Sequence, residues 1–282
     1  MSAILLAALI VGITEPISVR VKSAKVQRLA WEDYLARVVE KEAGPGFPLE
    51  ALRAQAVVAR TYALQRIERA KVQKEKFDIE AGTLGQALSE KRGSEACRNA
   101  VSDTRGLVLS AEGRLIESFF HASCGGWTAE AKDVFRAESP GLESVKCLYC
   151  RDSRNFAWSG SLSRTGLSAA AKAIGLPGFI GFQPYEEDSR GRILSVKAAA
   201  PGWRAELPLT FLRRMAGESR LKSGLFDCVQ TGGHILYSGW GYGHGVGLCQ
   251  EGARGQAKRG KNFRAILKFY FPGAELVPVP DS

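Results

Sequence analysis

The chain has 282 residues, with 45% hydrophobic and 24% charged residues, which suits a globular protein of one large domain or two lobes. Its net charge of +10 indicates either an anionic partner, such as nucleic acid, a membrane surface or a wall polymer, or simply a solvated basic surface. Runs of Lys and Arg never exceed two residues, which excludes a basic nucleic-acid-binding arm.

Residues 1–16 form a short apolar N-terminal segment, and its first thirteen residues carry no charge. The segment is too short to span a bilayer as a helix, so we do not expect a transmembrane protein. It resembles the apolar region of a signal peptide, although it lacks a basic start and a clear cleavage site. A buried first strand and a start codon placed late are the alternatives.

The stretch 31–66 predicts two helices joined by a tight turn. Apolar residues recur at helical spacing from Tyr34 to Val39, and the next position on this stripe is Glu42. Gly44 and Gly46 can take positive φ and end the first helix. The second helix is expected over 49–66, with an inner face of small and aliphatic residues: Leu49, Leu52, Ala56, Ala59 and Ala63.

Glu42 is the candidate general acid. Burial and the negative end of the helix dipole both favour the protonated carboxyl, which is the form that a general acid needs. Gln55 borders the inner face of the second helix and could point towards Glu42. The alternative is an ordinary surface glutamate at a frayed helix end.

The remaining elements mix strands and helices without a regular βαβ pattern. Alternating residues at 17–29 predict one or two strands, and polar residues fill 70–93. Because no βαβ repeat or disordered linker is present, we expect an α+β domain over 17–279. Later predicted elements are a helix at 95–102, a hairpin at 107–120, a helix capped by Ser163, a hairpin and helix at 192–217, a strand, glycine loop and helix at 233–260, and a helix from 263.

His121, Cys124, Cys147 and Cys150 predict a metal site. HASCGGWT gives H-x2-C spacing and KCLYC gives C-x2-C spacing, and such side chains can close a tetrahedral zinc site. A zinc ion with four protein ligands has no open position, so its role would be structural. A disulfide between the same cysteines is the alternative in an oxidising compartment.

A glycine-dense segment, GWGYGHGVGLCQEGA, surrounds His244. Its glycines allow the backbone to approach a ligand closely, and its flanks do not support a nucleotide-binding Rossmann unit. His244 is either a ligand-binding residue on this loop or a structural one that bonds the backbone. Cys249 and Cys228 could pair, but spacing does not fix the connectivity.

Two of these segments resemble the signatures of the stage II sporulation protein D family, which includes amidase enhancers. They are YLARVVEKEAGPGFPLEALRAQAVVARTYAL and GWGYGHGVGLCQEGA; the stretch FDIEAGTLGQALSEK resembles a looser third motif. The resemblance implies that Glu42 is the catalytic glutamate and that Gln86 matches a motif glutamine. Three positions depart from the family pattern: Ala43 replaces Met, Gly44 replaces Pro, and Cys249 replaces Ser.

The resemblance implies a family-like α+β fold, in which the helical pair carrying the acid packs against mixed or antiparallel strands, as one domain or two lobes around a groove. The implied activity is that of a peptidoglycan lytic transglycosylase, which cleaves the MurNAc–GlcNAc β-1,4 bond and leaves 1,6-anhydro ends. Zinc, present in some members, is not required for this chemistry. Residues implied to bind substrate are Gln55, Gln86, His121, Tyr242, His244 and Gln250. Of these, Gln55, Gln86, His121 and His244 are candidates for orienting either the glycan or the acid.

The same resemblance implies peptidoglycan glycan strands as the substrate, stripped of stem peptides by an amidase acting upstream, and an exported protein in the periplasm or cell wall. We expect Glu42 to line a groove with the 121–128 and 242–250 loops. A non-catalytic wall-binding enhancer of an amidase is the alternative function. A zinc-dependent hydrolase would require an HExxH string or a spare ligand position, which the sequence lacks.

Overall fold

The computed structural model describes residues 16–21, 25–82, 86–178 and 181–279. All of the apolar segment 1–16 except Pro16 therefore lies outside the described residues. The described chain mixes helices with small sheets, so the predicted α+β class is confirmed. None of the described helices is both long and apolar enough to cross a membrane.

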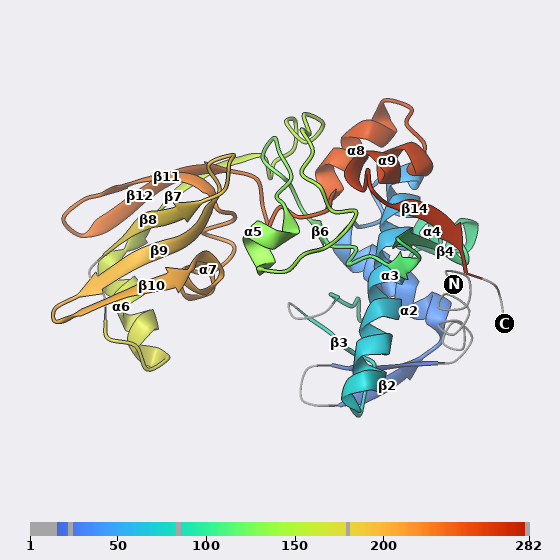
Figure 1. Cartoon of the computed structure of the whole chain (residues 1–282), viewed down its shortest axis with the longest axis horizontal. Helices are drawn as coiled ribbons and strands as arrows, with labels where there is room; N and C mark the ends of the chain where they lie inside the picture. The colour runs from blue at the N-terminus through green and yellow to red at the C-terminus, as the bar shows by residue number, and fades with distance from the viewer. Residues whose placement is uncertain (1–15, 22–24, 83–85, 179–180, 280–282) are drawn as a thin grey trace. The chain divides into compact units, whose positions relative to one another are not determined.

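The chain divides into two compact units (Figure 1). Unit 1 is built from residues 1–120, 138–143 and 253–282, and unit 2 from residues 121–137 and 144–252. Helix α8 (Gln250–Lys258) begins in unit 2 and continues into unit 1.

Unit 1 is mainly helical, with two three-stranded sheets. In the first sheet β1 pairs antiparallel with β2 and parallel with β3, and in the second β4 pairs antiparallel with both β14 and β5. Its helices are α2 (Trp31–Glu42), α3 (Leu49–Gln73), α4 (Glu95–Asp103) and α9 (Phe263–Tyr270). Its strands are β1 (Ile17–Arg20), β2 (Val26–Leu29), β3 (Ile79–Glu80), β4 (Leu107–Ala111), β5 (Arg114–Leu115) and β14 (Glu275–Pro278).

Helix α3 forms the centre of unit 1 (Figure 1). Alanine and valine side chains are buried around most of its circumference, and small side chains allow neighbouring helices to pack closely. The predicted inner face is buried from Leu52 onwards, whereas Leu49 at the start of the helix is 39% exposed. The helix also continues past the predicted end to Gln73, because Ile67 and Ala70 keep its buried stripe intact.

Unit 2 is mainly β structure (Figure 1). Two antiparallel sheets have the strand orders β10-β9-β8 and β11-β12-β7, and β13 pairs with β6. The strands are β6 (Phe120–His121, which begins at the last residue of unit 1), β7 (Ala157–Ser163), β8 (Gly181–Glu187), β9 (Ile193–Ala200), β10 (Trp203–Pro208), β11 (Leu225–Gln230), β12 (His234–Trp240) and β13 (Leu248–Cys249). The helices are α5 (Ala131–Phe135), α6 (Arg164–Ala173) and α7 (Leu209–Ala216).

One hydrophobic core joins both antiparallel sheets to α6 and α7. It contains Trp158 of β7, Phe182 of β8, Val196 of β9 and Leu212 of α7. The strands supply it by alternation, since every second residue of β12 is buried. The predicted cap of α6 is confirmed, because the Ser163 hydroxyl accepts a hydrogen bond from the backbone N–H of Gly166.

Candidate functional site

Glu42 is the last residue of α2, as predicted. The apolar stripe that leads to it is fully buried from Tyr34 to Val39. The residue as a whole is half-buried, and its Oε1 accepts a hydrogen bond of 2.8 Å from the backbone N–H of Ala87. Gly44, with φ of +82°, ends the helix immediately afterwards. A segment distant in sequence therefore holds the carboxyl in one orientation.

Gln86 has a supporting position next to this contact. Its Oε1 accepts from the hydroxyl of Tyr34 at 2.7 Å, and its Nε2 donates to the carbonyl of Ala59 at 3.1 Å. The side chain thus links α2 to α3, and Gln86 is only 1% exposed. Burial, with the added charges of Tyr62 and Glu42, raises the pKa of Tyr34, which keeps its hydroxyl a hydrogen-bond donor.

Gln55 and Gln86 are candidates for orienting either the glycan or the acid, and their burial favours the second role. Both are 1% exposed, because Gln55 belongs to the buried α3 and Gln86 bonds to Tyr34 and Ala59. A side chain buried in this way can fix the position of Glu42 and its neighbours, but it does not present its amide to a glycan. The backbone amide of Ala87 was not predicted as part of the site, because no residue pattern in the sequence indicates which backbone N–H will contact a distant side chain.

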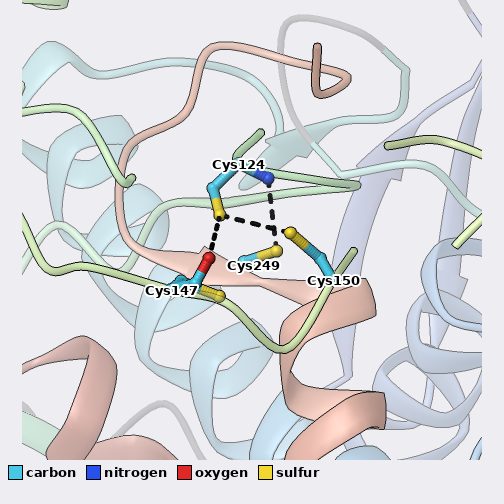
Figure 2. Close-up of side chains that lie close together, drawn as sticks. All are labelled: Cys124, Cys147, Cys150 and Cys249. Atoms are coloured by element: carbon cyan, nitrogen blue, oxygen red, sulfur yellow. Dashed lines mark hydrogen bonds between the residues drawn. The ribbon is translucent and has the colours of Figure 1, made fainter. Parts of the chain in front are cut away.

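The thiols of Cys124, Cys147, Cys150 and Cys249 meet in unit 2 (Figure 2). All four sulfur atoms lie within 4.8 Å of one another, and all four residues are buried. The Cys124 and Cys150 sulfurs are 3.5 Å apart, which is close to the separation of two thiolates on one tetrahedral zinc ion. All six cysteines are free, so no pair of these sulfurs is joined as a disulfide.

Cys249, not His121, supplies the fourth member of this group. Its Sγ accepts hydrogen bonds of 3.3 Å from the backbone N–H groups of Cys124 and Gly252. Hydrogen bonding with Cys124, Cys147 and Cys249 lowers the pKa of the Cys150 thiol, whereas burial raises the pKa of the Cys249 thiol. A metal ion binds the thiolate form, so metal binding would release the protons of these thiols. Four buried sulfur donors within 4.8 Å of one another fit a zinc ion held by four thiolates.

His121 lies outside the thiol group because its ring is held elsewhere. Its Nδ1 donates to the backbone carbonyl of Val246 at 3.0 Å, and the residue is 4% exposed. Burial first, and then repulsion from His244, lower its pKa well below the usual value, so the ring is neutral. The Nε2 atom of a ring protonated at Nδ1 is an acceptor. His121 is thus a buried residue of β6 that bonds to the glycine loop, and it is not one of the clustered metal ligands.

The backbone of Val246 joins the two motif histidines. Its N–H donates to Nδ1 of His244 at 3.1 Å, while its carbonyl accepts from His121. The neutral ring of His244 therefore carries its proton on Nε2 and is a donor there. The His244 ring contacts the rings of His121 and Phe135, with centroid separations of 5.6 and 5.2 Å, and these contacts help to fix its orientation.

The glycine loop rests on a buried arginine that sequence reasoning missed. Arg192 is 4% exposed, donates to the carbonyl of Cys124 at 3.2 Å and lies 3.8 Å from the carboxylate of Asp188. A Cβ atom added to Gly245 would meet its guanidinium carbon at 2.6 Å. Gly245 also has φ of +91°, so both its backbone conformation and its neighbour require glycine.

Replacing Gly245 by alanine should therefore destabilise the protein more than the same change at Gly202, which has φ of +72° and nothing within 4 Å of an added Cβ. The unfavourable φ costs about 1–2 kcal/mol at either position. Gly245→Ala should lose roughly 1–3 kcal/mol more, because the guanidinium of Arg192 must move. Urea unfolding of both variants measures the difference, and equal losses would show that Arg192 does not support the loop.

A cavity of about 330 Å³ lies beside His244 within unit 2. Its walls come from α5, β9, the junction of β10 and α7, and the glycine loop. A second cavity, of about 240 Å³, contains none of the predicted site residues and is lined by aromatic side chains such as Trp127 and Trp240. The first cavity thus connects a motif residue to a space that could admit a ligand.

The predicted site residues divide between the two units. Unit 1 holds Glu42, Gln55 and Gln86, and unit 2 holds His121, the clustered cysteines, Tyr242, His244 and Gln250. Tyr242 exchanges backbone hydrogen bonds with Ser123 at 2.7 and 3.0 Å, and Gln250 is a buried residue that begins α8.

Comparison with known proteins gives a consistent result. The family model described as Stage II sporulation protein matches residues 20–110, which include α2, α3 and Glu42. An uncharacterized protein of Brachyspira hyodysenteriae is 32% identical, with 89% of this chain and 68% of that protein aligned. Stage II sporulation protein D of Bacillus amyloliquefaciens is 28% identical over 93% of this chain and 79% of its own length.

The amidase enhancer of Bacillus subtilis is also similar, at 28% identity over 86% of this chain and 40% of the enhancer. These similarities extend far beyond the segment that the family model matches. Taken with the glutamate at the end of α2 and the glycine loop around His244, they show that the chain belongs to the stage II sporulation protein D family.

Proposed function

We propose that this protein is a peptidoglycan lytic transglycosylase in which Glu42 is the general acid and base. The observation that carries the proposal is the placement of Glu42, half-buried at the end of α2 and held by the Ala87 N–H, inside the segment that matches the family. Because Oε1 already accepts that hydrogen bond, the proton of the acid form belongs on Oε2. The net charge of +10 suits an anionic wall polymer.

In the proposed reaction Glu42 gives its proton to the glycosidic oxygen between MurNAc and GlcNAc as the bond to C1 breaks. The resulting carboxylate then takes the proton of the muramoyl 6-hydroxyl while that oxygen attacks C1. The products are a 1,6-anhydro end and a free 4-hydroxyl, and no water is consumed. One carboxyl group suffices, because the nucleophile belongs to the substrate, whereas hydrolysis commonly requires a second carboxylate.

Zinc has a structural role in this proposal. The thiolates of Cys124, Cys147, Cys150 and Cys249 would complete its tetrahedral shell, which leaves no position for substrate or water. The metal would hold together the loops that carry these cysteines, and the proton transfers would remain with Glu42.

Mass analysis of digestion products tests the proposed activity. Glycan strands freed of stem peptides should yield fragments that end in 1,6-anhydroMurNAc, each lighter by one water than the hydrolytic fragment. Strands that keep their peptides should be cleaved more slowly, which would place an amidase upstream. Cleavage products with ordinary reducing ends would contradict the transglycosylase mechanism. We also propose that the protein acts outside the cytoplasm, where its substrate is found.

A non-catalytic role is the second candidate, and the similarity to the amidase enhancer favours it. In that case the purified chain alone would release no fragments, but it would bind the strands and accelerate a partner amidase. The same digestion, performed with and without an amidase, separates the two candidates.

A further inference from the structure

The cavity beside His244 is lined by two buried arginines and by acidic groups. Arg192, Arg213 and the exposed Arg136, which pairs with Glu186, contribute positive charge, and Asp133 and Glu206 contribute negative charge. Its volume of about 330 Å³ is at the small end of ligand sites, which suits a single sugar unit and its substituent. The mixture of charges suits a ligand that carries both hydroxyl donors and an anionic group.

Arg213 is a buried cation in the wall of this cavity. It is 7% exposed, and its Nε and Nη2 donate to the carbonyls of Leu221 and Lys222 at 2.9 and 2.7 Å. Those partners are neutral, and among the described residues no carboxylate forms an ion pair with this guanidinium. The exposed Glu218 affects it only at longer range. A buried charge of this kind is costly unless an anion compensates it.

The other buried arginines differ from Arg213 in one respect each. Arg192 already has the carboxylate of Asp188 at 3.8 Å. Arg60 of unit 1 also donates to carbonyls, those of Val101 and Thr104, but it lines neither cavity described above. Arg213 alone of the three combines an uncompensated charge with a place in a cavity wall. Its two carbonyl contacts hold the guanidinium in a fixed orientation, as carboxylate recognition by arginine requires.

We propose that this cavity is a subsite for a sugar carboxylate, namely the lactyl carboxylate of N-acetylmuramic acid, with Arg213 as the residue that binds it. The proposal rests on the proposed function for the identity of the sugar. Hydroxyl and acetamido donors of the same sugar have acceptors in Asp133 and Glu206.

The subsite would distinguish stripped strands from peptide-bearing strands. The lactyl carboxylate is free only where the stem peptide has been removed; where the peptide is present, the same carbon belongs to a neutral amide. Arg213 would then have no anion to bind, and the peptide would have to fit in a small cavity. Selection for stripped glycan thus follows from charge and volume at one position.

Calorimetry on the full chain tests the subsite without turnover. The probes are a GlcNAc–MurNAc tetrasaccharide with free lactyl carboxylates and the same tetrasaccharide with both carboxylates converted to methylamides. The protein carries Glu42→Gln so that the first probe is not consumed. A hydrogen bond to a charged group contributes about 1.5–3 kcal/mol, so the free acid should bind roughly 10–150-fold more tightly than the amide. Equal affinities for the free acid and the amide would overturn the proposal before any substitution of Arg213 is made.

Substitution then identifies the residue. Arg213→Met should bring the two probes to within about twofold of each other while leaving amide binding unchanged, and Arg213→Lys should keep part of the preference. Arg214→Met is the matched control, because Arg214 is the next residue of α7, is exposed and does not line the cavity. Unchanged amide binding shows that the variant is folded; a preference for the acid that persists in Arg213→Met would refute the assignment.

Failure of the subsite and failure of the proposed function give different results. If anhydro products form but the two probes bind equally, only the subsite is wrong. If the acid is preferred and the preference depends on Arg213 but the active chain yields no anhydro products, the subsite stands and the transglycosylase proposal falls.

Discussion

Replacing Glu42 by glutamine should lower the rate of glycan cleavage by about 10²–10⁴-fold, because an amide cannot donate the proton that the leaving oxygen requires. The fold should be preserved. Glutamine has nearly the same shape, and its Oε1 can still accept the hydrogen bond from Ala87 that holds Glu42. The measurement is the rate of release of anhydro fragments, with a thermal melt to confirm folding.

Glu40→Gln is the matched control for this experiment. Glu40 lies two residues earlier in the same helix, is also partly buried, and accepts a backbone hydrogen bond at 3.1 Å, from Ser94. Its substitution should leave the cleavage rate unchanged. Full activity in Glu42→Gln, or an equal loss in Glu40→Gln, would exclude Glu42 as the acid.

Removing zinc should produce a large loss of stability. Protein purified without chelator should contain one zinc ion per chain, held by the four clustered cysteines. When the free zinc concentration is a thousandfold above the dissociation constant, zinc binding adds about 4 kcal/mol to the free energy of unfolding. In a chain of this size that corresponds to a melting temperature lower by roughly 10 °C in the metal-free protein. Below that temperature cleavage should continue, because Glu42 needs no metal.

Three variants distinguish the ligand set. Cys249→Ala should lose zinc, whereas His121→Gln and Cys228→Ala should retain it, because His121 is bonded to Val246 and Cys228 lies outside the thiol group. Elemental analysis gives the metal content of each. Protein that contains no zinc and in which Cys147 and Cys150 are oxidised would contradict the metal site.

The local signals in the sequence were sufficient for α2 and for the position of Glu42. The apolar spacing placed the glutamate at the helix end, and Gly44 ended the helix as expected. The length of α3 was underestimated, because the polar surface after position 66 obscured the buried Ile67 and Ala70. Strands β7, β8 and β11 were not predicted, and β7 pairs with β12, a strand distant in sequence, which no local pattern specifies.

Residue spacing in the sequence predicted only part of the candidate site. Cys124, Cys147 and Cys150 were identified from their spacing, but Cys249 follows the glycine loop and reaches the cluster only through the fold. Its presence where the family usually has serine was the available signal. The roles of Arg192 and Arg213 were missed because an arginine in a strand or helix pattern is normally exposed. The burial of Arg192 and Arg213 depends on the tertiary fold, and no local sequence pattern indicates it.

The thiol cluster should also determine how the backbone hydrogen bonds of unit 2 open during native-state hydrogen exchange. The segments that meet there share backbone hydrogen bonds: Ser123 with Tyr242, Ala129 with Gly245, and Cys147 with Gly126. With metal bound, none of these bonds can break for long without disturbing the shared thiolates. Native-state hydrogen exchange should therefore show these amides exchanging together, as a single cooperative opening event. After metal removal, each segment would exchange at its own rate.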